Sequence, residues 1–159
     1  MCVSFFVGDK MSEKYMNLAL KEAKKAYKHD DVPVGAVIIK DNKIISKAHN
    51  QKEKKKNATR HAEIIAIEKA CKKLKTWHLD DCILYVTLEP CLMCAGALIQ
   101  SRIKKVVYST PSEKFGYIES IDNVFLKNKN NHLVEIEKGL CAKKSQKLLK
   151  DFFKQKRKQ

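Results

Sequence analysis

The chain has 159 residues, of which 44% are hydrophobic, with only 5 Gly and 3 Pro; this fits one compact domain with a single core. No run of about 18 apolar residues occurs and the first ten residues lack the charged start and length of a secretory signal, which excludes a membrane-spanning helix and leads us to expect a cytoplasmic protein. The 33 Lys and Arg against 18 Asp and Glu give a net charge of +15, which favours a polyanionic partner such as nucleic acid or an anionic membrane surface.

Lysine supplies most of this charge, since Arg occurs only at positions 60, 102 and 157. A Lys-rich surface can also reflect genomic base composition, so charge alone leaves polyanion binding open. The first predicted element is a helix over 12–29, where apolar residues recur at helical spacing. Residues 1–11 are interpreted as an N-terminal extension or a misassigned start. A hairpin is predicted within 32–50, with its turn around Asp41.

The middle of the chain predicts two helices separated by a strand. A polar loop over 52–57 leads to Thr59, which is expected to be the N-cap of a helix over 60–74. A strand is predicted over 82–87. Pro90 then suits the first turn of a short apolar helix that ends near Ser101.

The rest of the chain continues the alternation of strands and helices that is typical of a layered α/β domain. A strand is predicted over 104–109. Residues 110–131 are weakly patterned and predict a loop with a short helix near 118–126. A strand over 132–137 precedes a helix from about Ala142 to the end.

Six cysteines in a protein without a secretory signal argue against a disulfide framework and point to metal binding or catalysis. Cys91 and Cys94 are spaced as Cys-x-x-Cys on one helical turn, which puts both sulfurs on one side of the helix. A helix N-terminus also favours thiolate over thiol. Of the other four, Cys71 and Cys82 lie among apolar residues of predicted core elements. Cys2 and Cys141 have no partner nearby in sequence.

Two thiolates need at least one further ligand to hold a metal. Like the two cysteines, His61 lies at the start of a predicted helix, which makes it the expected third ligand. The other four histidines do not share this feature: His29, His49, His78 and His132. With His61, a zinc ion would keep its fourth tetrahedral position open for water, as catalytic sites do. Such a water loses a proton near neutral pH, and Glu63 is expected to act as the base without binding the metal. A structural zinc cluster would need a fourth ligand, for which no well-spaced candidate exists.

The order of these residues is typical of a known class. His-x-Glu followed several tens of residues later by Pro-Cys-x-x-Cys is the signature of the zinc deaminases of nucleobases. From about Ser12 onward the chain also resembles the bacterial tRNA-specific adenosine deaminases in the stretches "VPVGAV", "HAEIIAI", "LYVTLEPCLMCAGALIQSRI", "NHLVEI" and "LLKDFFKQKRK". Residues 12–159 are therefore interpreted as a single zinc deaminase domain.

This resemblance implies a three-layer α/β/α cytidine-deaminase-like fold with a mixed five-stranded sheet. It implies a homodimer with one zinc ion per subunit, held by His61, Cys91 and Cys94, and Glu63 as the proton shuttle. The substrate that it implies is the wobble adenosine of an arginine tRNA anticodon, which is converted to inosine. Asn50 matches an asparagine that bonds the flipped-out purine, and the alternative for Asn50 is a loop-capping or turn residue.

The final helix combines charge with aromatic rings. Between Lys143 and Gln159 eight Lys or Arg and one acidic residue surround Phe152 and Phe153, a combination that suits phosphates and unpaired bases. Adjacent helical residues cannot both face inward, so one Phe is expected to be a core anchor and the other to lie near the substrate. By resemblance, Phe153 and Arg157 are the expected RNA neighbours.

One segment departs from the family. After the strand over 104–109 the family usually has an aspartate and a run rich in Gly and Ala, whereas this chain has bulkier residues over 111–119. Two other functions stay open. A deaminase of the same fold that acts on a free base or nucleoside, such as guanine or cytosine, would share every metal residue but has no use for a basic final helix. A catalytically silent RNA-binding module with a structural zinc would have no need for Glu63.

Overall fold

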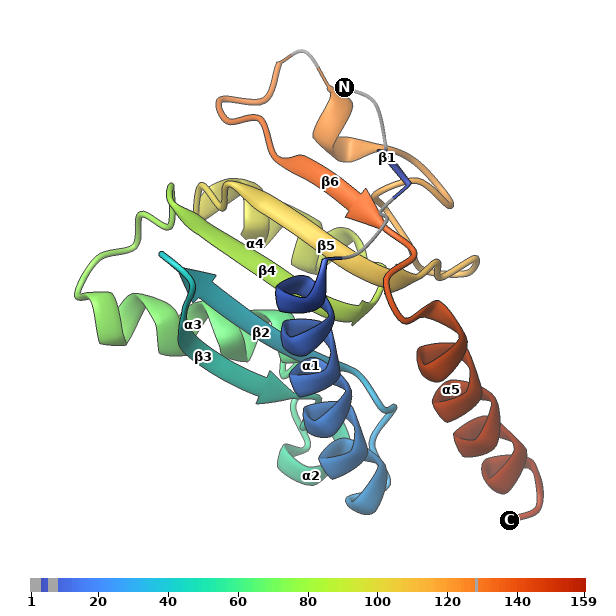
Figure 1. The fold of residues 1–159 in the computed structure, drawn as a ribbon. Helices are drawn as coiled ribbons and strands as arrows, with labels where there is room; N and C mark the ends of the chain where they lie inside the picture. The colour runs from blue at the N-terminus through green and yellow to red at the C-terminus, as the bar shows by residue number, and fades with distance from the viewer. Residues whose placement is uncertain (1–3, 6–8, 128) are drawn as a thin grey trace.

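The computed structural model describes residues 4–5, 9–127 and 129–159. Figure 1 shows the chain from its blue N-terminal to its red C-terminal end. The elements in order are β1 (Ser4–Phe5), α1 (Lys10–Lys28), β2 (Gly35–Lys40), β3 (Lys43–His49), α2 (Lys52–Lys55), α3 (Ala62–Leu74), β4 (Cys82–Leu88), α4 (Leu92–Gln100), β5 (Lys105–Thr110), the 3₁₀ turn η1 (Val124–Leu126), β6 (Glu135–Lys138) and α5 (Ala142–Arg157). No helix among the described residues is long and apolar enough to cross a membrane.

The strands form one mixed sheet in the order β1-β6-β5-β4-β2-β3. β2 is antiparallel to β3 and β4, whereas β4, β5 and β6 run parallel. These five strands confirm the predicted mixed five-stranded sheet. The two-residue β1 adds a parallel pairing to the edge of β6. Part of the segment interpreted as an extension therefore pairs with the sheet, while residues 1–3 and 6–8 lie outside the described part of the chain.

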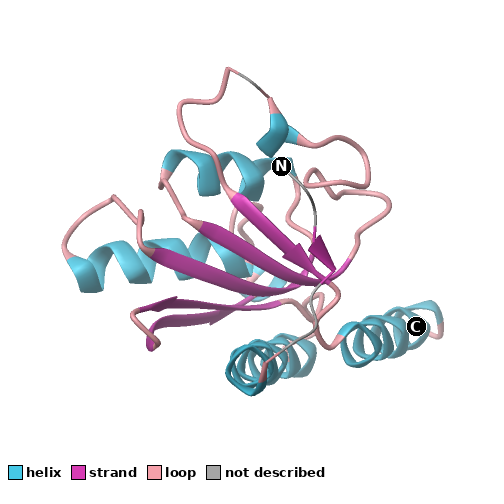
Figure 2. Ribbon diagram, turned by 45° about the horizontal axis from the view of Figure 1, so that its top comes forward, coloured by secondary structure: helices cyan, strands magenta, loops and turns pink. Residues whose placement is uncertain are grey.

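Helices cover both faces of the sheet and make the three predicted layers. α3 and α4 lie on one face and α1 and α5 on the other, as Figure 2 shows. Successive strand residues point to opposite faces. Ile38 and Leu84 accordingly pack in the apolar cluster with α3 and α4, whereas their neighbours Val37 and Tyr85 pack with α1. This alternation gives the domain its two apolar layers.

Cys71 and Cys82 belong to the core, as predicted. Cys82 is buried in the cluster on the α3 side of the sheet, and Cys71 is half-buried against it. On the other side α1 lies close to the start of β2: a Cβ on Gly35 would come within 1.8 Å of the Ala19 carbonyl oxygen. Glycine at this position lets the backbones of the helix and the strand approach each other.

Two helix starts differ from the prediction. α3 begins at Ala62 with His61 as its N-cap, so the prediction of Thr59 was wrong. The Thr59 hydroxyl instead donates to the Asn57 side-chain oxygen at 2.8 Å and stabilises the preceding turn. α4 begins at Leu92 with Cys91 as its N-cap, so Pro90 lies just before the helix and not in its first turn.

Side chains that are distant in the sequence explain the other differences. The predicted loop over 52–57 contains α2. The backbone N–H groups of Glu53 and Lys54 in this helix donate to the Asp31 carboxylate at 2.7 and 3.1 Å. The short helix predicted near 118–126 is reduced to η1, because backbone N–H groups over 118–120 bond the Glu89 carboxylate. The last strand begins later than predicted and spans residues 135–138.

Candidate active site

The three expected metal ligands converge at the N-termini of α3 and α4. His61 is the N-cap of α3, Cys91 is the N-cap of α4, and Cys94 lies in the first turn of α4. The Nδ1 atom of His61 lies 3.7 Å from the Sγ of Cys91 and 3.6 Å from the Sγ of Cys94. Nδ1 is therefore the ring nitrogen that faces both sulfurs.

This donor set fits one zinc ion. Zinc–sulfur and zinc–nitrogen bonds at a tetrahedral angle place the two donor atoms about 3.6 Å apart, which the nitrogen–sulfur distances of 3.6 and 3.7 Å match. The three donor atoms all lie within 4.8 Å of one another, and the described residues contain no other group of three His, Cys, Asp or Glu placed to hold a metal. Two sulfurs and an imidazole are donors that zinc prefers.

The electrostatics of the cluster favour a bound cation. Hydrogen bonds from Cys94 and His61 lower the pKa of Cys91 to about 4, and the N-terminus of α4 stabilises the thiolate further. The hydrogen bond with Cys91, together with burial, raises the pKa of Cys94. A metal between the two sulfurs would favour the thiolate form of both, because ligand binding and deprotonation are coupled.

Glu63 lies beside these ligands, in the first turn of α3. Its side chain is buried, and burial raises the pKa of Glu63 to about 7. The charge of Cys91 also raises the pKa of Glu63, whereas the charge of His61 and a hydrogen bond with Cys94 lower it. His61 and Glu63 can serve one site because the N-cap backbone of His61 is extended (φ −78°, ψ 152°), so helical spacing does not separate them. A buried carboxyl that can change protonation near neutral pH suits a general acid and base.

A cavity of about 440 Å³ lies at Asn50, between α5 and the segments that follow α1 and β3. The Asn50 amide is held at both ends: its Oδ1 accepts the Ala62 N–H at 2.8 Å and its Nδ2 donates to the Val32 carbonyl oxygen at 3.1 Å. Four basic and three acidic side chains line the same cavity: Lys52, Lys54, Lys56 and Lys156, and Asp30, Asp31 and Glu53. The cavity thus combines one amide with charges of both signs and a small excess of positive charge.

The two phenylalanines of α5 differ as their adjacent positions predict. Phe152 is 4% exposed and packs edge-on against Tyr27, with ring centroids 5.5 Å apart. Phe153 is 45% exposed and lines the cavity. Among the basic residues that follow, Lys156 lines the cavity, whereas Arg157 is exposed and does not.

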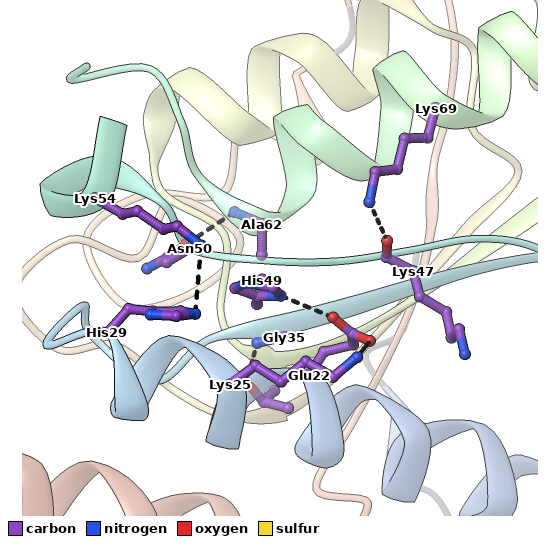
Figure 3. A network of polar contacts seen from close by, with 11 residues as sticks. Glu22, Lys25, His29, Gly35, Lys47, His49, Asn50, Lys54, Ala62 and Lys69 are labelled. Atoms are coloured by element: carbon purple, nitrogen blue, oxygen red, sulfur yellow. Dashed lines mark hydrogen bonds and ion pairs between the residues drawn. The ribbon is translucent and has the colours of Figure 1, made fainter. Parts of the chain in front are cut away.

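The other histidines do not join the cluster. Figure 3 shows His49 at the end of β3, where its Nδ1 bonds the buried Glu22 carboxylate of α1 at 2.8 Å. The His29 ring stacks on the His49 ring, with 6.3 Å between the two ring centroids. His132 bonds the Ile103 carbonyl oxygen at 2.7 Å.

Comparisons with known proteins place this geometry in a family. A profile of the MafB19-like deaminases matches residues 10–157. A tRNA-specific adenosine deaminase of Aquifex aeolicus is 47% identical over 142 residues, which cover 89% of this chain and 93% of the relative. The chain belongs to the tRNA-specific adenosine deaminases. A second member of this family, from Bacillus subtilis, is 42% identical over 146 residues, with 92% and 91% of the two chains covered.

Solved structures agree with this family and its cytidine-deaminase-like fold. A structure described in a study of A-to-I editing by tRNA:A34 deaminases at the wobble position has a TM-score of 0.83 at 38% identity, and covers 86% of this deaminase and 99% of that chain. A guanine deaminase of Bacillus subtilis has a TM-score of 0.59 at 42% identity, but covers only 62% and 64% of the two chains. The likeness to the guanine deaminase is thus the less extensive of the two.

Glu89 of this deaminase, which no sequence motif marks as functional, is 2% exposed. Its carboxylate accepts hydrogen bonds from the backbone N–H groups of Ser112, Ile118, Glu119 and Ser120 and from the Ser120 hydroxyl. Burial opposes ionisation of this carboxyl, but the bonds from Ser120 and the backbone amides outweigh it and lower the pKa of Glu89. The signal in the sequence is an acidic residue at the end of an apolar strand, directly before Pro-Cys.

Glu89 fixes the segment that departs from the family next to the metal ligands. Gly116 of this segment forms an isolated β-bridge with Cys91. A Cβ on Gly116 would come within 2.2 Å of the Glu89 carboxylate. A side chain at position 116 would therefore collide with this carboxylate, and glycine avoids the collision. The bulkier residues over 111–119 therefore lie against the N-terminus of α4.

Proposed function

We propose that this enzyme catalyses the zinc-dependent hydrolytic deamination of the wobble adenosine to inosine in a tRNA anticodon loop, with an arginine tRNA as the expected substrate. One observation carries the proposal: His61, Cys91 and Cys94 lie at distances that suit one zinc ion, with the buried carboxyl of Glu63 beside them. The chain that holds this site belongs to a family whose relatives are named tRNA-specific adenosine deaminases.

The side chains of the site have distinct roles in this reaction. Zinc held by His61, Cys91 and Cys94 would polarise a water molecule for attack on C6 of adenine. Glu63 takes the proton from the attacking water and gives it to ring nitrogen N1, since its pKa of about 7 allows both steps near neutral pH. Glu63 then moves the remaining proton of the added hydroxyl to the 6-amino group; the bond between C6 and this nitrogen breaks, ammonia leaves, and inosine remains with a C6 carbonyl and a proton on N1. Asn50 bonds the purine through the second hydrogen of its Nδ2.

The cavity at Asn50 supports an RNA loop as the substrate. The exposed Phe153 lines it, together with four lysines and three acidic residues, and the chain as a whole carries a net charge of +15. Positive side chains contact phosphates, and an exposed ring can stack on an unpaired base. A free base needs none of these groups outside the metal site. The second proposed RNA contact is Arg157, which follows Lys156 on the exposed end of α5.

The Phe153→Ala variant tests the stacking contact. We expect the affinity for an anticodon stem-loop to fall by about 1–3 kcal/mol, because the exposed ring is lost while the buried Phe152 still anchors α5. Fluorescence anisotropy with a labelled stem-loop measures this change. Gln155→Ala, on the exposed surface of the same helix, is the matched control and should bind as wild type does. Equal affinity of the two variants would exclude Phe153 from the RNA interface.

The substrate class is tested by offering the holoenzyme an anticodon stem-loop and, separately, free bases and nucleosides. Inosine in the stem-loop alone is the expected result. The alternative is a deaminase of free guanine or cytosine, which the partial likeness to guanine deaminase favours. Ammonia released from guanine or cytosine, with no inosine in the stem-loop, would replace the proposed function by this alternative.

We also infer a cytoplasmic homodimer with one zinc ion per subunit. Three apolar side chains at the start of α4 and in the adjoining segment are exposed: Leu92 by 52%, Met93 by 36% and Phe115 by 69%. Neighbouring exposed apolar side chains mark contact surfaces between proteins. Because α4 also carries Cys94, an interface here would lie close to the metal ligands.

A further inference from the structure

The start of α3 has a buried backbone N–H that its N-cap residue does not satisfy. The first N–H groups of a helix have no partner within it, and an N-cap side chain usually bonds that of the second or third helical residue, so the first needs an acceptor from elsewhere. The N-cap of α3 is His61, which makes no capping bond because its imidazole faces Cys91 and Cys94. Ala62, the next residue, is 0% exposed, so water cannot reach its N–H.

Asn50 provides this acceptor from the end of β3. Its Oδ1 accepts the Ala62 N–H at 2.8 Å across 12 residues of chain, as the dashed line between the two residues in Figure 3 shows. Asn50 is itself held in place, since its Nδ2 donates to the Val32 carbonyl oxygen at 3.1 Å and its backbone N–H to the Val34 carbonyl oxygen at 3.1 Å. The capping oxygen is therefore presented by a fixed strand end.

We propose that Asn50 is a positioning residue for the metal site: its side chain caps the first N–H of α3, and so fixes the backbone that aims the imidazole of His61 at the metal. The inference rests on the proposed function, in which His61 is a zinc ligand. It gives Asn50 a role beyond its contact with the purine. One amide would serve both, with Oδ1 on the helix and the second Nδ2 hydrogen on the substrate.

Loss of this cap would act on His61 through the backbone. A helix turns by about 100° per residue, so if the uncapped start of α3 unwinds by even one residue, the peptide unit that carries His61 changes direction. The imidazole would then leave its position 3.6 to 3.7 Å from the two sulfurs. Groups that orient a metal ligand without touching the metal change metal affinity by about 10- to 100-fold when they are removed.

The experiment measures zinc affinity by chelator competition, without RNA. Asn50→Ala removes both the capping oxygen and the purine donor, and we expect its zinc affinity to fall by about 10- to 100-fold. Asn50→Asp keeps an acceptor for the Ala62 N–H, and its negative charge suits a helix N-terminus, so we expect it to recover zinc affinity to within about threefold while activity stays low. Gln51→Ala is the matched control, because this neighbouring side chain makes no capping bond, and should bind zinc as wild type does.

Hydrogen exchange of the Ala62 amide gives a second measurement that needs neither zinc nor activity. We expect this amide to be protected in wild type and in Asn50→Asp, and to exchange faster in Asn50→Ala. If Asn50→Ala keeps wild-type zinc affinity and Ala62 protection but loses turnover, or if Asp and Ala weaken zinc binding equally, the positioning role is wrong. If wild type binds no zinc, the proposed function fails, and the exchange measurement still decides whether Asn50 caps α3.

Discussion

The Glu63→Gln variant should retain its zinc and lose nearly all turnover. Proton transfer by a positioned side chain contributes about 10²- to 10⁴-fold in rate, and a glutamine can neither take the proton from the water nor give it to N1. Gln has almost the shape of Glu, so it fills the same buried space beside His61. Since burial already raises the pKa of Glu63 to about 7, the protein tolerates a neutral group at this position, and we expect the variant to fold.

This prediction is checked by two measurements on the same sample: turnover of the stem-loop and zinc content per chain. Glu68→Gln is the matched control, since Glu68 lies on the same helix, is exposed, and pairs with Arg60 at 2.7 Å. It should turn over as wild type does. Near-normal turnover of Glu63→Gln with full zinc would show that Glu63 is not the proton shuttle. Loss of zinc together with turnover would assign Glu63 to the support of the metal instead.

The chemistry of the site could be predicted from the sequence because it is local. His61 and Glu63 are separated by one residue, and Cys91 and Cys94 by two, so helix starts in the right place are enough to aim each pair. Their convergence followed from the motif and not from the spacing. The mixed sheet followed from resemblance, and its alternation is readable in strands such as β2, where Val37 and Ile38 face opposite clusters.

What the sequence could not predict depends on side chains that reach across the fold. Asn50 caps a helix 12 residues later, and Asp31 caps α2 over 22 residues. Glu89 gathers amides as far away as Ser120. In each case a polar side chain satisfies backbone groups of another segment, and local propensity favoured something else: a cap at Thr59, a loop at 52–57, a helix near 118–126. Those local preferences were outweighed because backbone N–H groups at helix starts and in buried segments need acceptors.

Replacing Cys91 by alanine should weaken zinc binding by roughly 100-fold and abolish activity. Zinc binding at such sites is worth about 10–16 kcal/mol near pH 7; divided over four ligands this is about 3 kcal/mol per ligand, or roughly a 100-fold loss of affinity. The loss should reach that size here because Cys91 is the thiol whose pKa is lowered to about 4, and the remaining Cys94 and His61 offer two donors only.

Two comparisons separate loss of the metal from loss of the fold. Cys141→Ala removes a half-buried thiol outside the cluster and should keep zinc and turnover. Wild type stripped by a chelator should lose activity and regain it on addition of Zn²⁺, and the added zinc should raise its Tm, since a ligand that binds only the native state stabilises it. The same addition should raise the Tm of Cys91→Ala by less than it raises the Tm of wild type. If Cys91→Ala instead retains zinc and deaminates the stem-loop, the ion is held elsewhere, and the convergence of His61 with the two sulfurs cannot be the basis of the reaction.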